Sequence, residues 1–485
     1  MAGVTAVESA PGVSFTDTTS ASSFSSNAIT NFFLPILADA RNNSTVLWNY
    51  IKDGVYTLDT SGRYIIWPVQ YGRNTGHNAM HPGGSLPLPA SEQYRTYTSE
   101  TRTAVARIKV DGETLRRAKT NGGAFVTAVM RESDSMVDNI TVDMARQIHN
   151  DGSGRMGEVR VTATAGDIVI QVKFNSAIEG AASLMSGATA LVGKPTMYFE
   201  VGDRVSFISA TGTLRALTSG AQNAFYVTAV TPTTISVDVT QGTTTAMDVT
   251  VFATKPTATD WIVRASNEVV TDYNSTAYRA EIMGTGGMLS DANVADGLGL
   301  STAGQQTGAQ NQTSSATGFQ GIDGAVATAL SFNVGIVNDN GGSGLRALTE
   351  ALMQQTVSDA EEINNANIDL CVMPYGTYNS FVKLVLPDRR FNNTTDLKGG
   401  HKTIDFNGLP VIKDRFCYPG RVMFLATDIL RRFTVEPLRP LAYQGVTTWE
   451  RLRDIDAYWT GWIASENIGA LVRNKTGALL TELNA

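Results

Sequence analysis

Residues 111–150 read DGETLRRAKTNGGAFVTAVMRESDSMVDNITVDMARQIHN, and this stretch decides the fold class. Large apolar side chains recur along it every three or four residues, and they are Leu115, Phe125, Val129, Met136, Ile140, Met144 and Ile148. An α-helix makes one turn in about 3.6 residues, so this spacing places the apolar side chains on one face. The pattern predicts one long amphipathic helix whose apolar face packs against a core.

Strand-like segments precede this helix. Residues 64–69 and 98–110 both have the composition of strands, and apolar residues alternate along the second segment. The residues between them, 72–91, are rich in glycine and proline. The sequence therefore predicts a long hairpin that leads into the long helix.

The sequence changes character after the helix. Residues 157–275 are dominated by Val, Thr, Ile and Gly and alternate with a period of two, which predicts an all-β module, either a small barrel or a sandwich. Residues 284–318 are mostly small and polar, and this composition predicts an exposed loop. Helical patterns return only after about residue 320, so the module is predicted to be an insertion in a larger α+β domain.

Composition limits the classes of protein that fit. The chain has 485 residues, of which 42% are hydrophobic, which is enough for two or three domains. A net charge of −7 argues against a protein that binds nucleic acid by itself, because such binding needs many Lys and Arg contacts to phosphate. The two cysteines, Cys371 and Cys417, match no zinc spacing and are predicted to be core residues. The N-terminal residues do not resemble a signal peptide and no long apolar run occurs, so we expect neither secretion by that route nor a membrane span.

Two motifs could indicate chemistry, and neither has the right context. Residues 152–157 match the glycine pattern of dinucleotide-binding loops, but here a predicted helix precedes the glycines and strands follow them, which is the reverse order. His77 and His81 lie in a Gly- and Pro-rich loop, where no helix would direct both imidazoles toward one metal ion. We therefore expect no catalytic residue, no cofactor and no metal site, and an enzyme is the least expected class.

Several short sequence segments, taken together, resemble segments of the major capsid proteins of tailed bacteriophages, which have the Hong Kong 97 fold. Residues 62–69, GRYIIWPV, resemble the start of the extended E-loop of that family, and residues 124–148 resemble its spine helix. Residues 281–284 and 319–322 resemble the chain's re-entry into the axial A-domain, and residues 408–414, GLPVIKD, resemble late A-domain strands. The C-terminal strands, with Trp459 and Trp462, would complete the peripheral P-domain.

The resemblance implies an α+β fold with a spine helix, an E-loop hairpin, a P-domain and an A-domain, to which the inserted β barrel or sandwich is added. The implied divisions are 1–45 for an N-terminal arm and short helix, 46–110 for the first P-domain strands and the E-loop, 111–156 for the spine helix, 157–275 for the inserted all-β domain, 276–440 for the A-domain and 441–485 for the C-terminal P-domain strands.

The resemblance also implies a function. Such a chain would be a structural protein of the virion capsid, assembling with itself as hexamers and pentamers, in the host cytoplasm, into an icosahedral shell around double-stranded DNA. Its other implied partners are a portal protein, a cement or decoration protein, and packaged DNA through non-specific contact, with no membrane. Only some 25 residues precede the first predicted helix, so we expect a separate scaffolding protein. No lysine occurs between Lys52 and Lys109, which disfavours the covalent E-loop links of some relatives.

Charged side chains on predicted loops are the candidate interface residues. We expect charge pairs between subunits at Arg73, Glu92 and Arg95 in the hairpin and at Asp388, Arg389 and Arg390 in an A-domain loop. The inserted module would bridge or stabilise neighbouring subunits. Two alternatives remain: a cellular nanocompartment shell of the same fold, and a β-rich tail or adhesion protein that binds glycans through residues 157–275.

Overall fold

A computed structural model shows the protein as two compact units. The described residues are 46–53, 60–61, 64–77, 79–82, 84, 86, 88–111, 136, 139–140, 142–152, 154–163, 169–174, 194–209, 215, 224–239, 252, 254–258, 260–265, 281–289, 335–340, 344–385, 394–396, 402–440, 450–451 and 456–484. The first unit comprises Met1–Val46, Thr103–Ala145 and Thr434–Glu466, and the second comprises Leu47–Arg102, Arg146–Phe433 and Asn467–Ala485. The predicted arm, 1–45, and the predicted interface residues Asp388, Arg389 and Arg390 lie outside the described residues.

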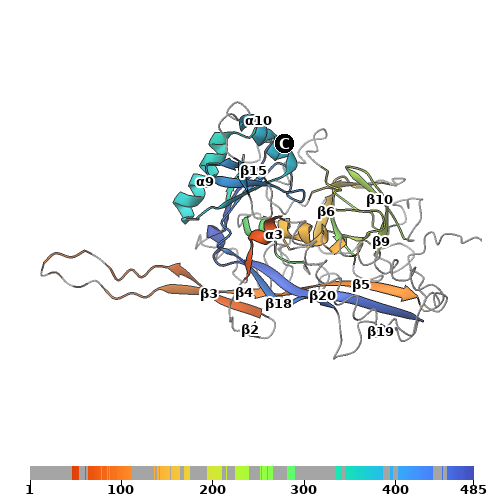
Figure 1. The fold of residues 1–485 in the computed structure, drawn as a ribbon, viewed down its shortest axis with the longest axis horizontal. Coiled ribbons are helices and arrows are strands. Elements are labelled where there is room, and N and C mark those ends of the chain that lie inside the picture. The colour runs from red at the N-terminus through yellow and green to blue at the C-terminus, as the bar shows by residue number, and fades with distance from the viewer. Residues whose placement is uncertain are drawn as a thin grey trace, which may run out of the picture. The chain divides into compact units, whose positions relative to one another are not determined.

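The predicted hairpin is present in the second unit. Strands β3 (Tyr64–Gly72) and β4 (Gln93–Glu100) pair antiparallel, and the short β2 (Thr60–Ser61) extends this sheet in the order β2-β3-β4. Figure 1 shows β3 and β4 in orange as the two arms. The returning strand differs from the prediction, because 98–110 is not one strand. Strand β4, which pairs with β3, ends at Glu100. The next strand, β5 (Arg102–Asp111), pairs with β20 (Ala457–Ala470) instead.

The C-terminal part of the predicted long helix is also present. Residues 142–149 are helical, and the helix ends at His149. Met144 and Ile148, two of the residues that the spacing placed on the apolar face, are buried. Residues 112–135, which would form its earlier turns, lie outside the described part of the chain.

The inserted module forms a closed barrel. Its strands are β6 (Arg155–Val159), β7 (Ile170–Lys173), β8 (Arg204–Ile208), β9 (Phe225–Val230), β10 (Thr234–Asp238) and β11 (Trp261–Arg264). They are hydrogen-bonded in the order β10-β7-β6-β11-β8-β9. The β9–β10 hairpin is closed by a hydrogen bond from the Thr231 amide to the Thr234 carbonyl, 2.9 Å. Phe207, Phe225 and Phe252 pack in the barrel interior, with ring centroids 4.7–5.9 Å apart.

A mixed seven-stranded sheet follows the barrel in sequence. Its strands are β12 (Ile336–Asn338), β13 (Leu370–Met373), β14 (Thr394–Asp396), β15 (Lys402–Phe406), β16 (Leu409–Lys413), β17 (Val422–Leu425) and β21 (Gly477–Leu480), in the order β12-β21-β17-β13-β16-β15-β14. Helices α9 (Glu350–Asn364) and α10 (Tyr375–Val385) share one apolar core with the sheet. Cys371 and Cys417 are buried free thiols, as predicted.

The chain's C-terminal strands lie in two sheets. β20 and β21 belong to different sheets, and the 3-10 turn η8 (Arg473–Lys475) joins them. β21 pairs antiparallel with β17 and parallel with β12. Gly477 permits this, because it has φ of 146° and a Cβ there would overlap the carbonyl of Phe424.

The remaining strands form a five-stranded sheet. It contains β1 (Lys52–Asp53), β18 (Leu430–Pro440), β20 and β19 (Glu450–Arg451), in that order, and β5 also pairs with β20. In the first unit the Arg107 guanidinium lies 4.1 Å from the centre of the Trp459 ring. The short helix α3 (Val46–Tyr50) precedes β1. None of the helices in the described residues is both long and apolar enough to cross a membrane.

Candidate functional site: the exposed hairpin and the buried junction

The base of the hairpin is fixed by an apolar cluster. Alternate residues of β3, Ile65, Trp67 and Val69, turn one face inward and pack with Tyr97 of β4 and Phe433 of β18. The Trp67 ring centroid lies 5.0 Å from that of Phe433 and 5.7 Å from that of Tyr97. Ring pairs at these separations add to the stabilisation that comes from burial.

Hydrogen bonds hold the same base. Trp67 Nε1 donates to the Leu471 carbonyl over 3.4 Å, and Asn467 Nδ2 donates to Ser99 Oγ over 3.1 Å. Burial raises the pKa of Tyr97, and its hydroxyl is hydrogen-bonded to the backbone of Arg473. The base of the hairpin is therefore positioned by residues 467–473, which lie far away in sequence.

The outer part of the hairpin is solvent-exposed. Among its described residues, the exposed fractions are 50% for Met80, 79% for Leu86 and 86% for Leu88. We call these three residues the apolar tip. The local order near the tip comes from short-range bonds, such as the one from the Gly84 amide to the His81 carbonyl, 2.8 Å.

The predicted interface residues of the hairpin contact other residues of the hairpin. Glu92 accepts a hydrogen bond from the Tyr94 hydroxyl, and this bond, with the negative charge of Glu92, raises the pKa of Tyr94. The Arg95 guanidinium lies 5.9 Å from the centre of the Tyr71 ring. Arg73 is exposed, as are Glu92 and Arg95. The structure thus places all three on the hairpin surface, and charge pairing between subunits stays a prediction.

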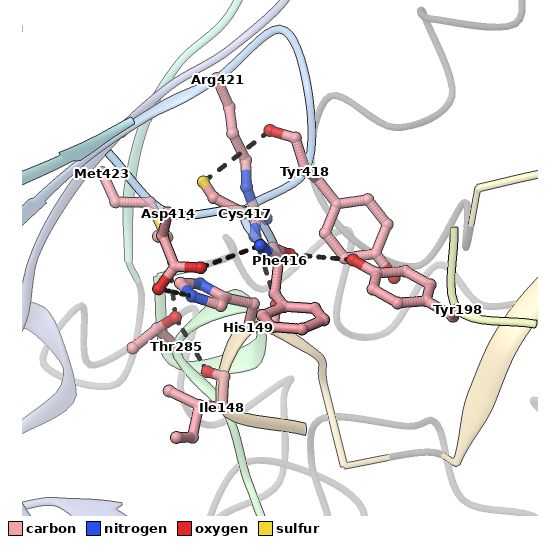
Figure 2. Close-up of polar contacts among 10 residues, drawn as sticks. All are labelled: Ile148, His149, Tyr198, Thr285, Asp414, Phe416, Cys417, Tyr418, Arg421 and Met423. Atoms are coloured by element: carbon pink, nitrogen blue, oxygen red, sulfur yellow. Dashed lines mark hydrogen bonds and ion pairs between the residues drawn. The ribbon is translucent and has the colours of Figure 1, made fainter. Parts of the chain in front are cut away.

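A second candidate site is a buried polar junction at the end of helix 142–149. The last carbonyl groups of a helix have no partner within the helix and need donors from elsewhere. Thr285 Oγ1 donates to the Ile148 carbonyl over 3.1 Å, and Arg421 Nη2 donates to the His149 carbonyl over 3.2 Å. The helix end is therefore capped by side chains from two distant segments, as Figure 2 shows.

The segment that supplies Thr285 corrects the sequence prediction. Residues 284–318 are predicted to form an exposed loop, but α6 (Thr285–Leu289) is a helical turn in which every residue is buried. Gly284 sits so close to the end of helix 142–149 that a Cβ would overlap the carbonyls of Gln147 and Asn150. The small residues therefore serve close packing, which composition does not distinguish from a loop. Residues 290–318 lie outside the described part of the chain.

A contact between a histidine and a carboxylate joins the helix end to the segment that follows β16. His149 Nε2 lies 3.1 Å from Asp414 Oδ2, and both side chains are buried. Asp414 Oδ1 accepts a bond from the Phe416 amide over 2.8 Å. Burial acts to raise the pKa of Asp414, but the charge and hydrogen bond of His149 and the Phe416 amide outweigh it, so this pKa lies below its ordinary value. The pair therefore favours an ionised Asp414.

The barrel is joined to the same junction by aromatic side chains. The Tyr198 hydroxyl donates to the Phe416 carbonyl over 2.8 Å, and the Phe174 and Tyr418 ring centroids lie 5.3 Å apart. Figure 2 shows Tyr198 directed toward the loop that carries Phe416 to Tyr418. Burial raises the pKa of the Cys417 thiol to about 11, which makes it a poor nucleophile. The junction thus holds four segments together, the helix end, α6, the loop 414–421 and the barrel, and has the properties of a structural centre.

The two histidines that the sequence analysis considered as metal ligands lie in the exposed hairpin. His77 Nδ1 is 3.0 Å from the Asn74 carbonyl. Within the described residues, no cluster of three or more His, Cys, Asp or Glu side chains could hold a metal ion. The junction was not predicted from the sequence. The one signal that could have indicated it is the pair of polar residues, His149 and Asn150, at the end of an apolar helical face.

The protein was compared with known proteins. No family model matches the chain, and no curated protein matches it. Several solved structures that resemble it over 91% of its length are phage structures, and two of them are phage capsid structures. One is the capsid asymmetric unit of cyanophage A-1(L), with 10% identity, a TM-score of 0.45 and 93% of that chain covered. Another is from Gordonia phage Cozz, with 10% identity, a TM-score of 0.36 and 91% of this chain and 87% of that chain covered.

An encapsulin resembles a smaller part of the chain. It belongs to a holo-encapsulin complex from Synechococcus elongatus, with 11% identity and a TM-score of 0.24. The match covers 31% of this chain and 52% of the encapsulin chain. The class that the structure itself defines is a mixed helix and strand protein with an inserted closed barrel and a long exposed hairpin.

Proposed function

We propose that this protein is a major capsid protein with the Hong Kong 97 fold, a shell subunit without a catalytic role. One observation carries the proposal: the hairpin β3–β4 is firmly anchored at its base and exposed along its outer part. A segment of this kind gains no burial from its own chain, so it becomes ordered and buried only against another subunit. An E-loop that overlaps a neighbour has this property.

The remaining elements take places in the same fold. Helix 142–149 is the end of the spine helix, strands β12 to β17 with α9 and α10 belong to the A-domain, and β5 and β20 belong to the P-domain. Hexamers and pentamers of the subunit form an icosahedral shell around double-stranded DNA in the virion. A separate scaffolding protein, a portal protein and a cement protein are its partners, and assembly takes place in the host cytoplasm.

The barrel acts as a structural addition to this shell. Aromatic rings that stack on sugars need an exposed face. In the described part of the barrel the large aromatic side chains are buried, except for the half-buried Tyr226, and Phe174 and Tyr198 are engaged at the junction. This favours a barrel that stabilises the shell over one that captures glycans.

The test is negative-stain electron microscopy of the full chain after size-exclusion chromatography, alone and with a candidate scaffolding protein. Rings or closed shells are the expected result. A monodisperse monomer under every condition would overturn the proposal and direct attention to glycan binding by residues 157–275. Recovery of a protein cargo inside shells formed in cells without phage genes would instead favour the nanocompartment.

The charged residues of the hairpin are tested in the same assay. If Arg95 pairs with a neighbouring subunit, Arg95→Glu reduces the yield of particles and leaves the circular dichroism spectrum of the monomer unchanged. If this variant forms particles in normal yield, Arg95 is not an interface residue.

A further inference from the structure

Helix α10 begins at the edge of the seven-stranded sheet where two parallel strands end. β13 and β16 are neighbouring parallel strands with Met373 opposite Lys413, and α10 starts shortly after β13, at Tyr375. The amide of Asp414, the first residue after β16, donates to the Met373 carbonyl over 2.9 Å and fixes the two strand ends against each other. In open α/β sheets, ligands bind outside the carboxyl ends of parallel strands, and this edge has the same arrangement.

No side chain of the described residues caps the first turn of α10. The first amide groups of a helix have no acceptor within the helix, and a polar side chain before the helix often accepts from one of them. At α9 this residue is Thr349, whose Oγ1 accepts a hydrogen bond from the Leu352 amide over 3.2 Å. The corresponding residue at α10 is Pro374, which has no side-chain acceptor, and the first turn contains no acidic residue. The amides of Gly376 and Thr377 are therefore available to a ligand.

A buried hydroxyl group in the same turn has no hydrogen-bond partner. Thr377 is fully buried, and its Oγ1 forms no hydrogen bond with the described part of the chain. Side chains of a helix lean toward its N-terminus, so the hydroxyl of this third helical residue lies over the first turn, beside the free amides. A buried hydroxyl without a partner destabilises the fold, and a ligand that accepts its hydrogen bond removes that cost.

Lys413 supplies positive charge at the same place. Its Nζ lies 5.5 Å from the centre of the Tyr375 ring and 5.7 Å from that of the Tyr378 ring, so the ammonium group is beside the first turn of α10. Lys413 is exposed and forms no ion pair with the described residues, because the neighbouring Asp414 carboxylate contacts His149 in the junction. The helix dipole adds partial positive charge at this end of the helix. Amides, a hydroxyl and an ammonium group together suit an anion.

We propose that the start of α10 binds a phosphate group through the amides of Gly376 and Thr377, the Thr377 hydroxyl and the Lys413 ammonium group. A phosphate group has several oxygens that accept hydrogen bonds from different directions, and helix N-termini are a recurring site for it. The ring of Tyr375, which is 51% exposed, borders the site and can contact an organic group that carries the phosphate. This inference goes beyond the shell function and does not depend on it.

A small phosphate fits this site better than the backbone of a nucleic acid. Nucleic acids are held by many Lys and Arg contacts to phosphate along a surface. The cation that the structure places beside the first turn is Lys413, whereas the guanidinium of the nearby Arg415 lies 5.6 Å from the centre of the Phe416 ring. The chain as a whole carries a charge of −7. The charge at this edge therefore suits a single phosphate group.

The first experiment measures the unfolding midpoint of the full, unassembled chain in increasing inorganic phosphate, with chloride added to keep the ionic strength constant. The test variant is Lys413→Gln. The matched control is Lys383→Gln, which removes an exposed cation from the last turn of the same helix. Hydrogen exchange of the α10 amides then locates the bound phosphate.

We expect phosphate to raise the midpoint of the wild type and of the control, because a ligand that binds only the folded state stabilises it. The apparent affinity of Lys413→Gln for phosphate should fall about tenfold, the effect of losing one hydrogen bond to a charged group. Exchange should slow at the first turn of α10. Equal stabilisation by phosphate and chloride, or equal affinities of the test and control variants, overturns the inference.

A second variant separates binding from folding. Thr377→Val replaces the hydroxyl by a methyl group of similar size. Without phosphate we expect its midpoint to equal or exceed that of the wild type, because an unpartnered buried hydroxyl stabilises nothing. Its affinity for phosphate should fall about fivefold, the effect of losing one neutral hydrogen bond. A lower midpoint without phosphate, together with an unchanged affinity, shows that the hydroxyl serves the fold and overturns the inference.

A third measurement identifies the source of the phosphate group. Phenyl phosphate and a short double-stranded oligonucleotide replace inorganic phosphate in the same assay. Tighter binding of phenyl phosphate, lost in Tyr375→Ala, supports the site and assigns it to a phosphorylated organic molecule, whereas equal binding supports the site and assigns it to the free ion. Stabilisation by the oligonucleotide alone overturns the small-phosphate site. None of these measurements involves assembly, so their failure leaves the shell function untouched.

Discussion

The hairpin tip and the buried junction differ in how far their side chains are exposed to solvent. At the junction, His149, Asp414 and Arg421 are buried and bonded to groups of the same chain. At the tip, Leu86 and Leu88 are almost fully exposed. A chain stabilises its own fold with the first kind of region and retains the second for association. Substitutions at the junction should therefore lower the stability of the subunit, whereas substitutions at the tip should lower assembly alone.

The largest effect on stability is expected at Gly284. In Gly284→Ala the new Cβ would overlap backbone carbonyls of Gln147 and Asn150, which cannot move without disturbing the helix end. We expect a loss of about 3 kcal/mol or more in the free energy of unfolding, measured by chemical denaturation.

Gly344→Ala is the control for this substitution. Gly344 has φ of 97° and nothing near its Cβ position, so alanine there costs only the backbone strain, about 1–2 kcal/mol. Equal losses in the two variants would show that close packing at the junction is unimportant.

A smaller, pH-dependent effect is expected at Asp414. Asp414→Asn keeps an oxygen for the Phe416 amide but removes the negative charge beside His149, and we expect a loss of about 1–3 kcal/mol near pH 7. Because the pKa of Asp414 is lowered in the folded protein, its contribution is complete above the ordinary pKa of 3.8 and disappears as the pH falls through the lower, folded value.

Unfolding midpoints of both proteins between pH 7 and about pH 3 check this expectation, and the difference between them should shrink below about pH 4. The exposed Glu361→Gln on α9 is a control that should show no such trend. A difference that stays constant across this range would mean that the charge of Asp414 adds nothing.

The base of the hairpin should respond more weakly. Tyr97→Phe removes the buried hydroxyl that is bonded to the backbone of Arg473, while the edge contact with Trp67 can remain. We expect a loss of about 0.5–1.5 kcal/mol and faster hydrogen exchange in β3 and β4. Tyr94→Phe, on the exposed side of β4, should change stability by less than about 0.5 kcal/mol. If hydrogen exchange in β3 and β4 is unchanged in Tyr97→Phe, the Tyr97 hydroxyl does not stabilise the base of the hairpin.

The smallest effect on folding is expected at the tip. Leu86→Ser should change the free energy of unfolding by less than about 0.5 kcal/mol, because the side chain is 79% exposed in the subunit. Chemical denaturation of dilute, unassembled protein measures this. A loss as large as that of Asp414→Asn would contradict the comparison between the two regions, since it would show that the tip stabilises its own chain.

Periodicity in the sequence predicted the elements whose residues are close together in the chain. It placed Met144 and Ile148 on a buried helical face and an all-β module after that helix. It failed where small residues pack closely, as at α6, since glycine and threonine occur in both loops and tight contacts. It also failed to separate β4 from β5, which lie in different sheets, because both strands show the same alternation of apolar and polar residues whichever strand they pair with.

The sequence by itself determined the hairpin, the end of the helix, the all-β insertion and the uncharged tip, because each depends on residues that are neighbours along the chain. Only the tertiary structure decided that β21 enters the sheet beside β17, that His149 meets Asp414 and that Arg421 caps the helix. These contacts join segments that are far apart in sequence. Their partners are selected by burial and by the need to satisfy backbone groups, which no local pattern records.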